Sequence, residues 1–309
     1  MPRKGDVVTG QILVPLDGSP LAEQALAGAM MLGRKLPAEL VLLRAVSIAP
    51  DFRETLSDVG LEAAAIMEKL EAEANDYLRE VEDQLRGADL RARRVVRHGP
   101  AAEVIVNYAT QTGVQQIVMA THGHTGMTRW AHGSVAERVL QSAGVPVLLV
   151  RAQEGEFTRS RELRELQRIL VPLDGSTTAE QVLPAATLIA KAMCAEMALL
   201  RVSIVYLLGS FVGEWLEPLQ GSFKTANQCA KDYLDHVGGR LEGEGVEVST
   251  TVQMGAVAES IVQYAETQQM DLIAMCTHGR TGVGRWTLGS VADRVLRASS
   301  MPILLVRAQ

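Results

Sequence analysis

The chain is 309 residues long, with a net charge of −6, 47% hydrophobic residues and 21% charged residues. This length allows about two domains of ordinary size, and the acidic balance lacks the basic footprint that nucleic-acid binders need. The apolar stretch 145–150 is far shorter than the roughly 18 residues that cross a bilayer, and the run 12–16 is too short for a signal-peptide core. We therefore expect a cytoplasmic protein with neither a nucleic-acid nor a membrane partner.

Short apolar runs alternate with longer helical patterns along the whole chain. In chain order the first half predicts a strand near 11–16, a helix near 20–36, a strand near 39–46, a helix near 62–86, a strand near 91–98, a helix near 101–113, a strand near 115–121, a helix near 134–143 and a strand near 146–151. The second half predicts strands near 168–173, 196–205, 246–254, 271–277 and 302–307. Apolar strands separated by helical crossovers predict a doubly wound, open parallel sheet that is covered on both faces.

The second half repeats the first. "QILVPLDGS" at 11–19 matches "RILVPLDGS" at 168–176, at an offset of 157 residues, and the later glycines match at an offset of 156. A repeat of about 140 residues is a whole domain rather than one unit of a solenoid. We expect one domain at 1–151, a polar linker at 152–167 and a second domain at 168–309.

A glycine-rich phrase follows the fourth predicted strand in each half: "MATHGHTGMTRWAHGSVAERVL" at 119–140 and "MCTHGRTGVGRWTLGSVADRVL" at 275–296. Glycines at the start of a helix let a phosphate approach unpaired backbone N–H groups at the positive end of the helix dipole. The simpler alternative is structural, because Ser134 and Glu137 have the spacing of a capping box, with Asp293 in place of the glutamate in the second half.

Another repeated phrase places Asp17 and Asp174 just after the first strand of each half, and Ser19 with Pro20 has the signature of a helix N-cap. In the strand order 3-2-1-4-5, strands one and four are neighbours, and the crevice at their carboxyl ends is the usual ligand site. Both repeated phrases converge on that crevice. The aspartates are either ligand contacts or turn residues.

Other chemistries have less support. His122, His124 and His132 resemble a metal cluster, but the second half retains only His278 of the three, so we expect no metal site. The loop lacks a P-loop lysine, and its serine lacks the elbow motif of a nucleophile. A binding module is therefore favoured over a fast enzyme. The uneven spacing of the three cysteines indicates neither a disulfide framework nor a zinc site.

These motifs together resemble the universal stress protein family, here as two domains in one polypeptide. The resemblance rests on ILVPLDGS, the T-H-G-x-T-G loop, the Gly-Ser helix start and the endings "VPVLLVR" and "MPILLVR". It implies a loop of the form Gly-x2-Gly-x9-Gly-Ser/Thr in ATP-binding members. Ala120 and Cys276 stand where that motif has its first glycine.

The resemblance implies one nucleotide site per half, with Asp17 and Ala45, or Asp174 and Val202, near the adenine. The cofactor-binding positions in the first half are Pro15, Asp17, Ala45, Ala120, His122, Gly123, Gly126, Gly133, Ser134 and Val135. In the second half they are Pro172, Asp174, Val202, Cys276, His278, Gly279, Gly282, Gly289, Ser290 and Val291.

The resulting hypothesis is an ATP-binding regulatory module for stress responses, with ADP or AMP as other ligands and Mg²⁺ able to accompany ATP. The alternatives are a slow ATPase or phosphotransferase and a nucleotide-free scaffold. The resemblance further implies that the halves pair as a pseudo-dimer through their last strands, with a homodimer as a further option. We expect the first site to bind more tightly, because Cys276 adds volume in the second.

Overall fold

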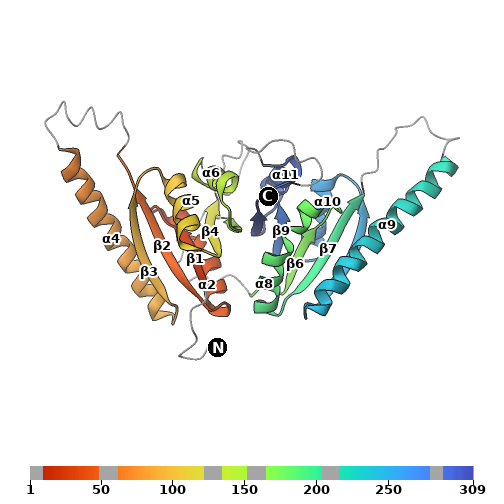
Figure 1. Ribbon diagram of the computed structural model, residues 1–309, viewed down its shortest axis with the longest axis horizontal. Coiled ribbons are helices and arrows are strands. Elements are labelled where there is room, and N and C mark those ends of the chain that lie inside the picture. Colours follow the sequence, from red (N-terminus) through yellow and green to blue (C-terminus); the bar gives the residue numbers. More distant parts are fainter. Residues whose placement is uncertain are drawn as a thin grey trace. The chain divides into compact units, whose positions relative to one another are not determined.

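The computed structural model describes residues 10–48, 62–121, 134–151, 165–203, 216–278 and 288–308, and for 216–226 the backbone alone (Figure 1). The chain divides into two compact units, Met1–Arg164 and Glu165–Gln309. Leu166 is buried, and the N–H of Gln167 donates to Asp271 Oδ2 at 2.8 Å, so these residues pack on the second unit. None of the described helices is long and apolar enough to cross a membrane.

The first unit alternates strands and helices as expected. Its elements are β1 (Gly10–Pro15), α1 (Pro20–Glu23), α2 (Ala25–Lys35), β2 (Ala38–Val46), α4 (Ala63–Gly87), β3 (Ala92–His98), α5 (Ala101–Thr112), β4 (Gln116–Thr121), α6 (Ser134–Ser142) and β5 (Val147–Arg151). The helix expected over 20–36 is divided at Gln24, whose N–H donates to Leu21 O at 3.2 Å, because one tighter turn redirects the chain there.

The second unit repeats this order. Its elements are β6 (Arg168–Pro172), α7 (Thr177–Glu180), α8 (Leu183–Met193), β7 (Glu196–Ser203), α9 (Leu216–Gly243), β8 (Val248–Met254), α10 (Val257–Thr267), β9 (Leu272–Cys276), α11 (Ser290–Ala298) and β10 (Ile303–Val306). The long crossover helices α4 and α9 occupy equivalent places in the two units.

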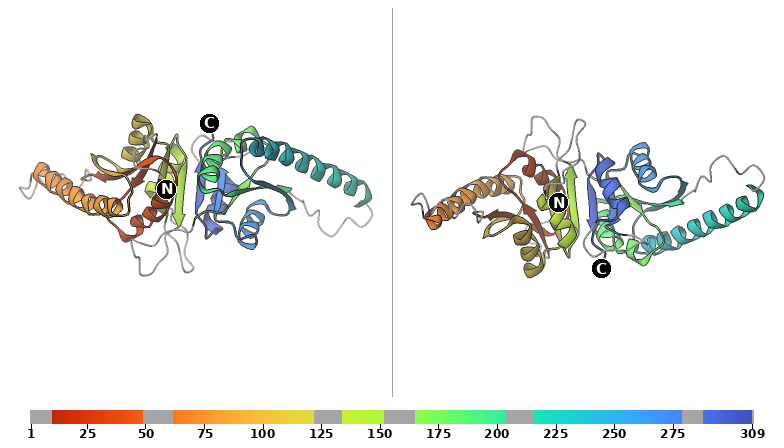
Figure 2. Two further views of the ribbon diagram at one scale, coloured as in Figure 1. Left: turned by 90° about the horizontal axis from the view of Figure 1, so that it is seen from below. Right: turned by 90° about the horizontal axis from the view of Figure 1, so that it is seen from above.

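Each unit contains a parallel sheet in the predicted order. The first runs β3-β2-β1-β4-β5 and the second β8-β7-β6-β9-β10, with parallel pairing between the neighbours. In the first unit α2 and α4 cover one face, and α5 packs with α6 on the other (Figure 2). The central strands β1 and β6 are buried along their middle residues because helices cover both faces. The doubly wound tandem fold is thus confirmed, whereas pairing of the halves through β5 and β10 stays a prediction.

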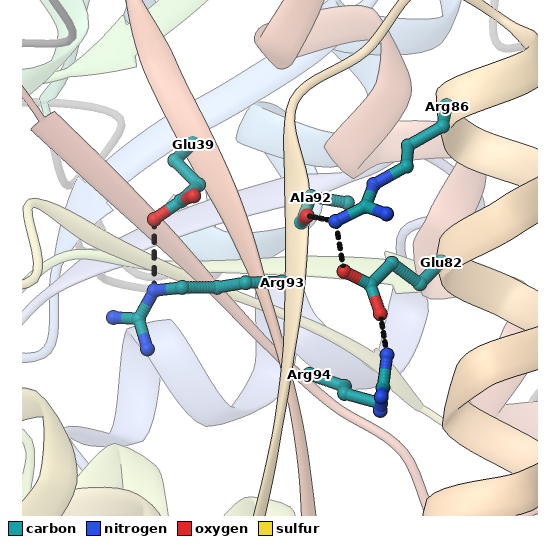
Figure 3. Close-up of polar contacts among 6 residues, drawn as sticks. All are labelled: Glu39, Glu82, Arg86, Ala92, Arg93 and Arg94. Atoms are coloured by element: carbon teal, nitrogen blue, oxygen red, sulfur yellow. Dashed lines mark hydrogen bonds and ion pairs between the residues drawn. The ribbon is translucent and has the colours of Figure 1, made fainter.

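The outer strand of the first unit is held by charged pairs on both faces (Figure 3). On one face Arg93 Nε lies 2.8 Å from Glu39 Oε2. On the other, Glu82 from α4 bonds both Arg94 and Arg86, the latter at 2.6 Å. Only 3% of the Glu82 side chain is exposed, so its charge depends on these two guanidinium groups.

Candidate functional site

The carboxyl ends of the strands place the predicted residues at one edge of each sheet. Pro15 ends β1 and Pro172 ends β6, and each crevice aspartate follows two residues later. The remaining predicted residues on the strands lie near the ends of their strands: Ala45 on β2, Ala120 on β4, Val202 on β7 and Cys276 on β9. In the second unit the charge of Asp174 acts on the Cys276 thiol, so the two repeated phrases do meet at this edge.

Both aspartates hold a tight turn. Asp17 Oδ1 accepts from the N–H of Ser19 at 2.8 Å, and Asp174 Oδ1 accepts from the N–H of Ser176 at 2.9 Å. The glycines between them, Gly18 and Gly175, have φ of +88° and +82°, a conformation that side chains rarely adopt. Both aspartates are therefore turn residues. The turn uses only the Oδ1 atom of each carboxylate, so Oδ2 can take part in other interactions.

The serines after these turns cap α1 and α7, which confirms the cap predicted at Ser19 and adds one at Ser176. Ser19 Oγ accepts from the N–H of Ala22 at 3.1 Å, and Ser176 Oγ accepts from the N–H of Ala179 at 3.1 Å. Ser176 Oγ also donates to Asp174 Oδ1 at 2.6 Å. A serine side chain thus accepts a hydrogen bond from a backbone N–H group in the first turn of each short helix.

The start of α11 is built differently. Its N-cap is Gly289, so the capping-box reading of Ser290 is wrong for this helix: Ser290 is the first helical residue, and Asp293 pairs with Arg297 at 2.8 Å instead. Asp293 is the first residue of α11 whose N–H has a backbone acceptor: it donates to the carbonyl of the N-cap Gly289 at 2.9 Å. No described residue accepts from the N–H groups of Ser290 or Val291.

Gly289 is required by packing. Its N–H donates to Thr277 O at 2.8 Å, and a Cβ at this position would lie 2.6 Å from the same backbone oxygen. The helix therefore starts in direct contact with the end of β9. This reason for a glycine is separate from any ligand, and the Gly289 N–H is already used.

Thr277 ties three segments together. Its N–H donates to Val306 O at 2.8 Å, its carbonyl accepts from Gly289, and its hydroxyl accepts from the N–H of Ala308 at 3.3 Å. His278 Nδ1 lies 3.1 Å from the same hydroxyl oxygen, and its buried Nε2 has no hydrogen-bond partner among the described residues. The end of β9, the start of α11 and the end of β10 form one hydrogen-bonded junction.

Cys276 is more buried than its counterpart. The residue is 6% exposed, whereas Ala120 is half-buried. Burial raises the pKa of the Cys276 thiol to about 12, an effect that the nearby backbone of Val182 opposes and the charge of Asp174 adds to. Because the Cys276 side chain is packed inside the unit, little of it is exposed to crowd a ligand. Weaker binding at the second site therefore stays a prediction, and its steric argument is weaker than the sequence suggested.

The helix start in the first unit has matching residues. Ser134 is exposed and Val135 is half-buried at the start of α6, as Ser290 and Val291 are in α11. The other predicted loop residues lie outside the described part of the chain: His122, Gly123, Gly126, Gly133, Gly279 and Gly282. The same holds for His124 and His132 of the rejected metal cluster.

A further set of residues at this edge escaped the sequence analysis. Arg44 lies over the ring of Tyr77 at 5.1 Å, and Arg201 lies over the ring of Tyr233 at 5.4 Å. The sequence does contain a signal for these pairs: the arginines repeat at an offset of 157 and the tyrosines at an offset of 156, like the repeated phrases themselves.

The sequence profile of the universal stress protein family matches residues 9–151 and 165–307. The chain belongs to this family. Universal stress protein MJ0531 of Methanocaldococcus jannaschii is 35% identical over 145 residues, which cover 46% of this chain and 82% of that protein. Universal stress protein MJ0577 of the same organism is 30% identical over 153 residues, covering 46% and 94%.

Among solved structures, a universal stress protein from Archaeoglobus fulgidus aligns over 96% of this chain and 98% of its own, with a TM-score of 0.69 and 21% sequence identity. At that identity the similarity establishes the fold. Two universal stress protein domains therefore account for nearly the whole chain.

Proposed function

We propose that this universal stress protein binds ATP in one or both of its crevices and acts as a regulatory module in the response to stress. The observation that carries the proposal is the pairing of two features at one sheet edge in the second unit: a turn that holds Asp174, and a helix start whose N–H groups at Ser290 and Val291 are unsatisfied among the described residues. Backbone N–H groups at a helix start are well suited to a phosphate.

The two ends of the ligand would meet different chemistry. Asp174 and Val202, at the ends of β6 and β7, suit the nucleoside, as Asp17 and Ala45 do in the first unit. The start of α11 suits the polyphosphate, and bound Mg²⁺ would neutralise part of the phosphate charge. The chain itself would bind and orient the ligand, and its bound state would change the surface offered to partners.

Gly289 cannot serve as the test of phosphate binding. A valine there would collide with the Thr277 carbonyl and displace α11 whether or not a ligand binds. Ser290 offers a cleaner test, because it is exposed and the helix does not depend on its side chain as a cap.

The experiment uses Ser134→Asp with Ser290→Asp in the full chain. A carboxylate at a helix start interacts favourably with the dipole, by about 0.3–1 kcal/mol, so the fold should be kept or stabilised. The same carboxylate repels phosphate and competes for the N–H groups. We expect calorimetry to show loss of ATP binding with an unchanged or higher melting temperature.

The matched control is Ser134→Ala with Ser290→Ala, which removes the hydroxyl groups without adding charge. This control should retain most ATP affinity, since backbone groups form the anion site. Equal ATP binding by the aspartate variant and the native chain would refute the assignment of phosphate to these helix starts. Absence of any nucleotide binding by the native chain would leave the scaffold function instead.

A further inference from the structure

Each unit places the same four side-chain types around the turn at the end of its first strand. We call this set the turn cluster. It consists of Asp17, Glu23, Arg44 and Tyr77 in the first unit and Asp174, Glu180, Arg201 and Tyr233 in the second. The four residues come from the turn itself, the short helix after it, the second strand and the long crossover helix.

In the second unit the contacts connect around the turn. Asp174 bonds Ser176, the N-cap of α7, and α7 carries Glu180 at its other end. Glu180 Oε1 accepts from the Tyr233 hydroxyl at 3.1 Å, and the Tyr233 ring carries the Arg201 guanidinium. The turn is thereby linked through α7 and α9 to β7.

Electrostatics show that these groups are close together. Burial raises the pKa of the Tyr233 hydroxyl, and the charges of Glu180 and Asp174 raise it further, whereas Arg201 lowers it. Arg240 Nη2 also pairs with Glu180 Oε2 at 3.0 Å. The crevice aspartate is therefore within the electrostatic reach of the tyrosine hydroxyl.

The first unit shows where the arginine lies relative to the turn. A Cβ at Gly18 would lie 3.3 Å from Arg44 Nη1, so the guanidinium is in contact distance of the turn that Asp17 closes. Glu23, on the short helix that follows the turn, is 4% exposed. An arginine fixed on a tyrosine ring thus supports the turn from the side of the second strand.

We propose that the arginine and the tyrosine of each turn cluster are positioning residues for the nucleoside end of the ligand, because they hold the aspartate turn against the end of β2 or β7. The inference rests on the proposed function and adds a division of labour to it. The turn cluster governs the nucleoside end, and the starts of α6 and α11 govern the phosphates.

The division of labour gives the test. In Arg44→Gln with Arg201→Gln, the full chain should bind ATP about tenfold more weakly, the lower end of what losing an orienting partner costs at metal sites. Affinity for inorganic tripolyphosphate, measured by the same calorimetry, should be unchanged, since it has no nucleoside. Equal weakening of both ligands, or unchanged ATP affinity in the folded variant, overturns the proposal.

Arg93→Gln is the matched control. Arg93 also lies over a tyrosine ring, that of Tyr108 at 6.0 Å, but near the amino end of β3, away from the crevice edge. This variant should bind both ligands as the native chain does. If the double arginine variant does not fold, Tyr77→Leu with Tyr233→Leu takes its place, because it removes the rings on which the arginines lie, with the same expected split between ATP and tripolyphosphate.

Hydrogen exchange without nucleotide separates this inference from the proposed function. Peptides over 16–20 and 173–177 should exchange faster in the double arginine variant and not in Arg93→Gln. Unaltered exchange at these turns contradicts the positioning role even where ATP binds. Faster exchange together with no ATP binding by the native chain supports the positioning of the turn and refutes the nucleotide function.

Discussion

The two units agree at the crevice edge and differ at the outer strand. On β3 the polar contacts are ionic: Arg93 pairs with Glu39, and Arg94 pairs with the buried Glu82. At the matching places on β8 the strand itself supplies hydroxyl groups: Ser249 donates to Glu196, and Thr250 donates to Asp235 at 2.7 Å. The cations that pair with these two carboxylates, Arg168 and Lys231, come from β6 and α9. An outer strand is partly open to water, so either guanidinium or hydroxyl side chains can occupy its polar positions.

The position of Glu82 shows the difference most sharply. Its counterpart on α9 is Gly238, where an added Cβ would lie 3.3 Å from Val248 Cγ1. The carboxylate that α9 offers to its outer strand comes instead from Asp235, about one turn earlier. By contrast the turn clusters have the same four residue types in both units, which indicates that the crevice edge constrains chemistry more than the outer strand does.

The largest expected effect comes from breaking the first unit's ionic contact. Glu82→Ala should lower the free energy of unfolding of the first unit by about 2–3 kcal/mol, less than the roughly 3–5 kcal/mol of a fully buried pair, since water can reach both guanidinium groups. Hydrogen exchange of peptides from α4 and β3 measures the loss. Gly238→Ala in the second unit should be near neutral, and equal losses from the two substitutions would contradict the comparison.

Gly289→Ala should cost the second unit about 1–3 kcal/mol, because the methyl group collides with the Thr277 carbonyl oxygen. The backbone at Gly289 has φ −60°, open to any residue, so conformational strain adds nothing. Ser290→Ala, one residue later, should change the free energy of unfolding by less than about 0.5 kcal/mol. Denaturant melts compare the two, and a neutral Gly289→Ala would show that α11 can move away from β9.

A pH-dependent difference between the units follows from Cys276. An unfolded thiol has a pKa of about 8.5, whereas burial raises the folded pKa to about 12. The neutral thiol's contribution is complete below pH about 8.5 and is lost as the pH rises toward the folded value, with a limiting slope of about 1.4 kcal/mol per pH unit. The second unit should lose stability between pH 8.5 and 10, and Cys276→Ala should remove that loss.

Cys229→Ala is the control for this slope, because Cys229 is exposed. Its pH profile should match that of the native chain. A slope that persists in Cys276→Ala would assign the loss to other groups.

The smallest expected effect compares the two turns themselves. Ser19→Ala and Ser176→Ala should each cost about 1 kcal/mol through loss of the helix cap. Ser176→Ala should cost about 0.5 kcal/mol more, since it also removes the hydroxyl bond to Asp174. Thermal melts of the two variants and of their combination measure this difference, and the reverse order would contradict it.

The sequence by itself determined the strands and the cap at Ser19. These features depend on local signals: apolar runs, Ser-Pro and Asp-Gly-Ser spacing, and the repetition of both across 156–157 residues. The family resemblance followed from the same phrases. Local signals sufficed because each is decided by residues close together in the chain.

The tertiary structure decided what lies between segments far apart in the sequence. Only packing reveals that Gly289 rests on the Thr277 carbonyl, so that Ser290 is the first helical residue instead of the cap. Likewise, the contact of the buried Cys276 thiol with the backbone of Val182 and the stacking of Arg201 on Tyr233 join residues from different elements. Such contacts depend on how elements meet across the sheet, which a single sequence pattern does not encode.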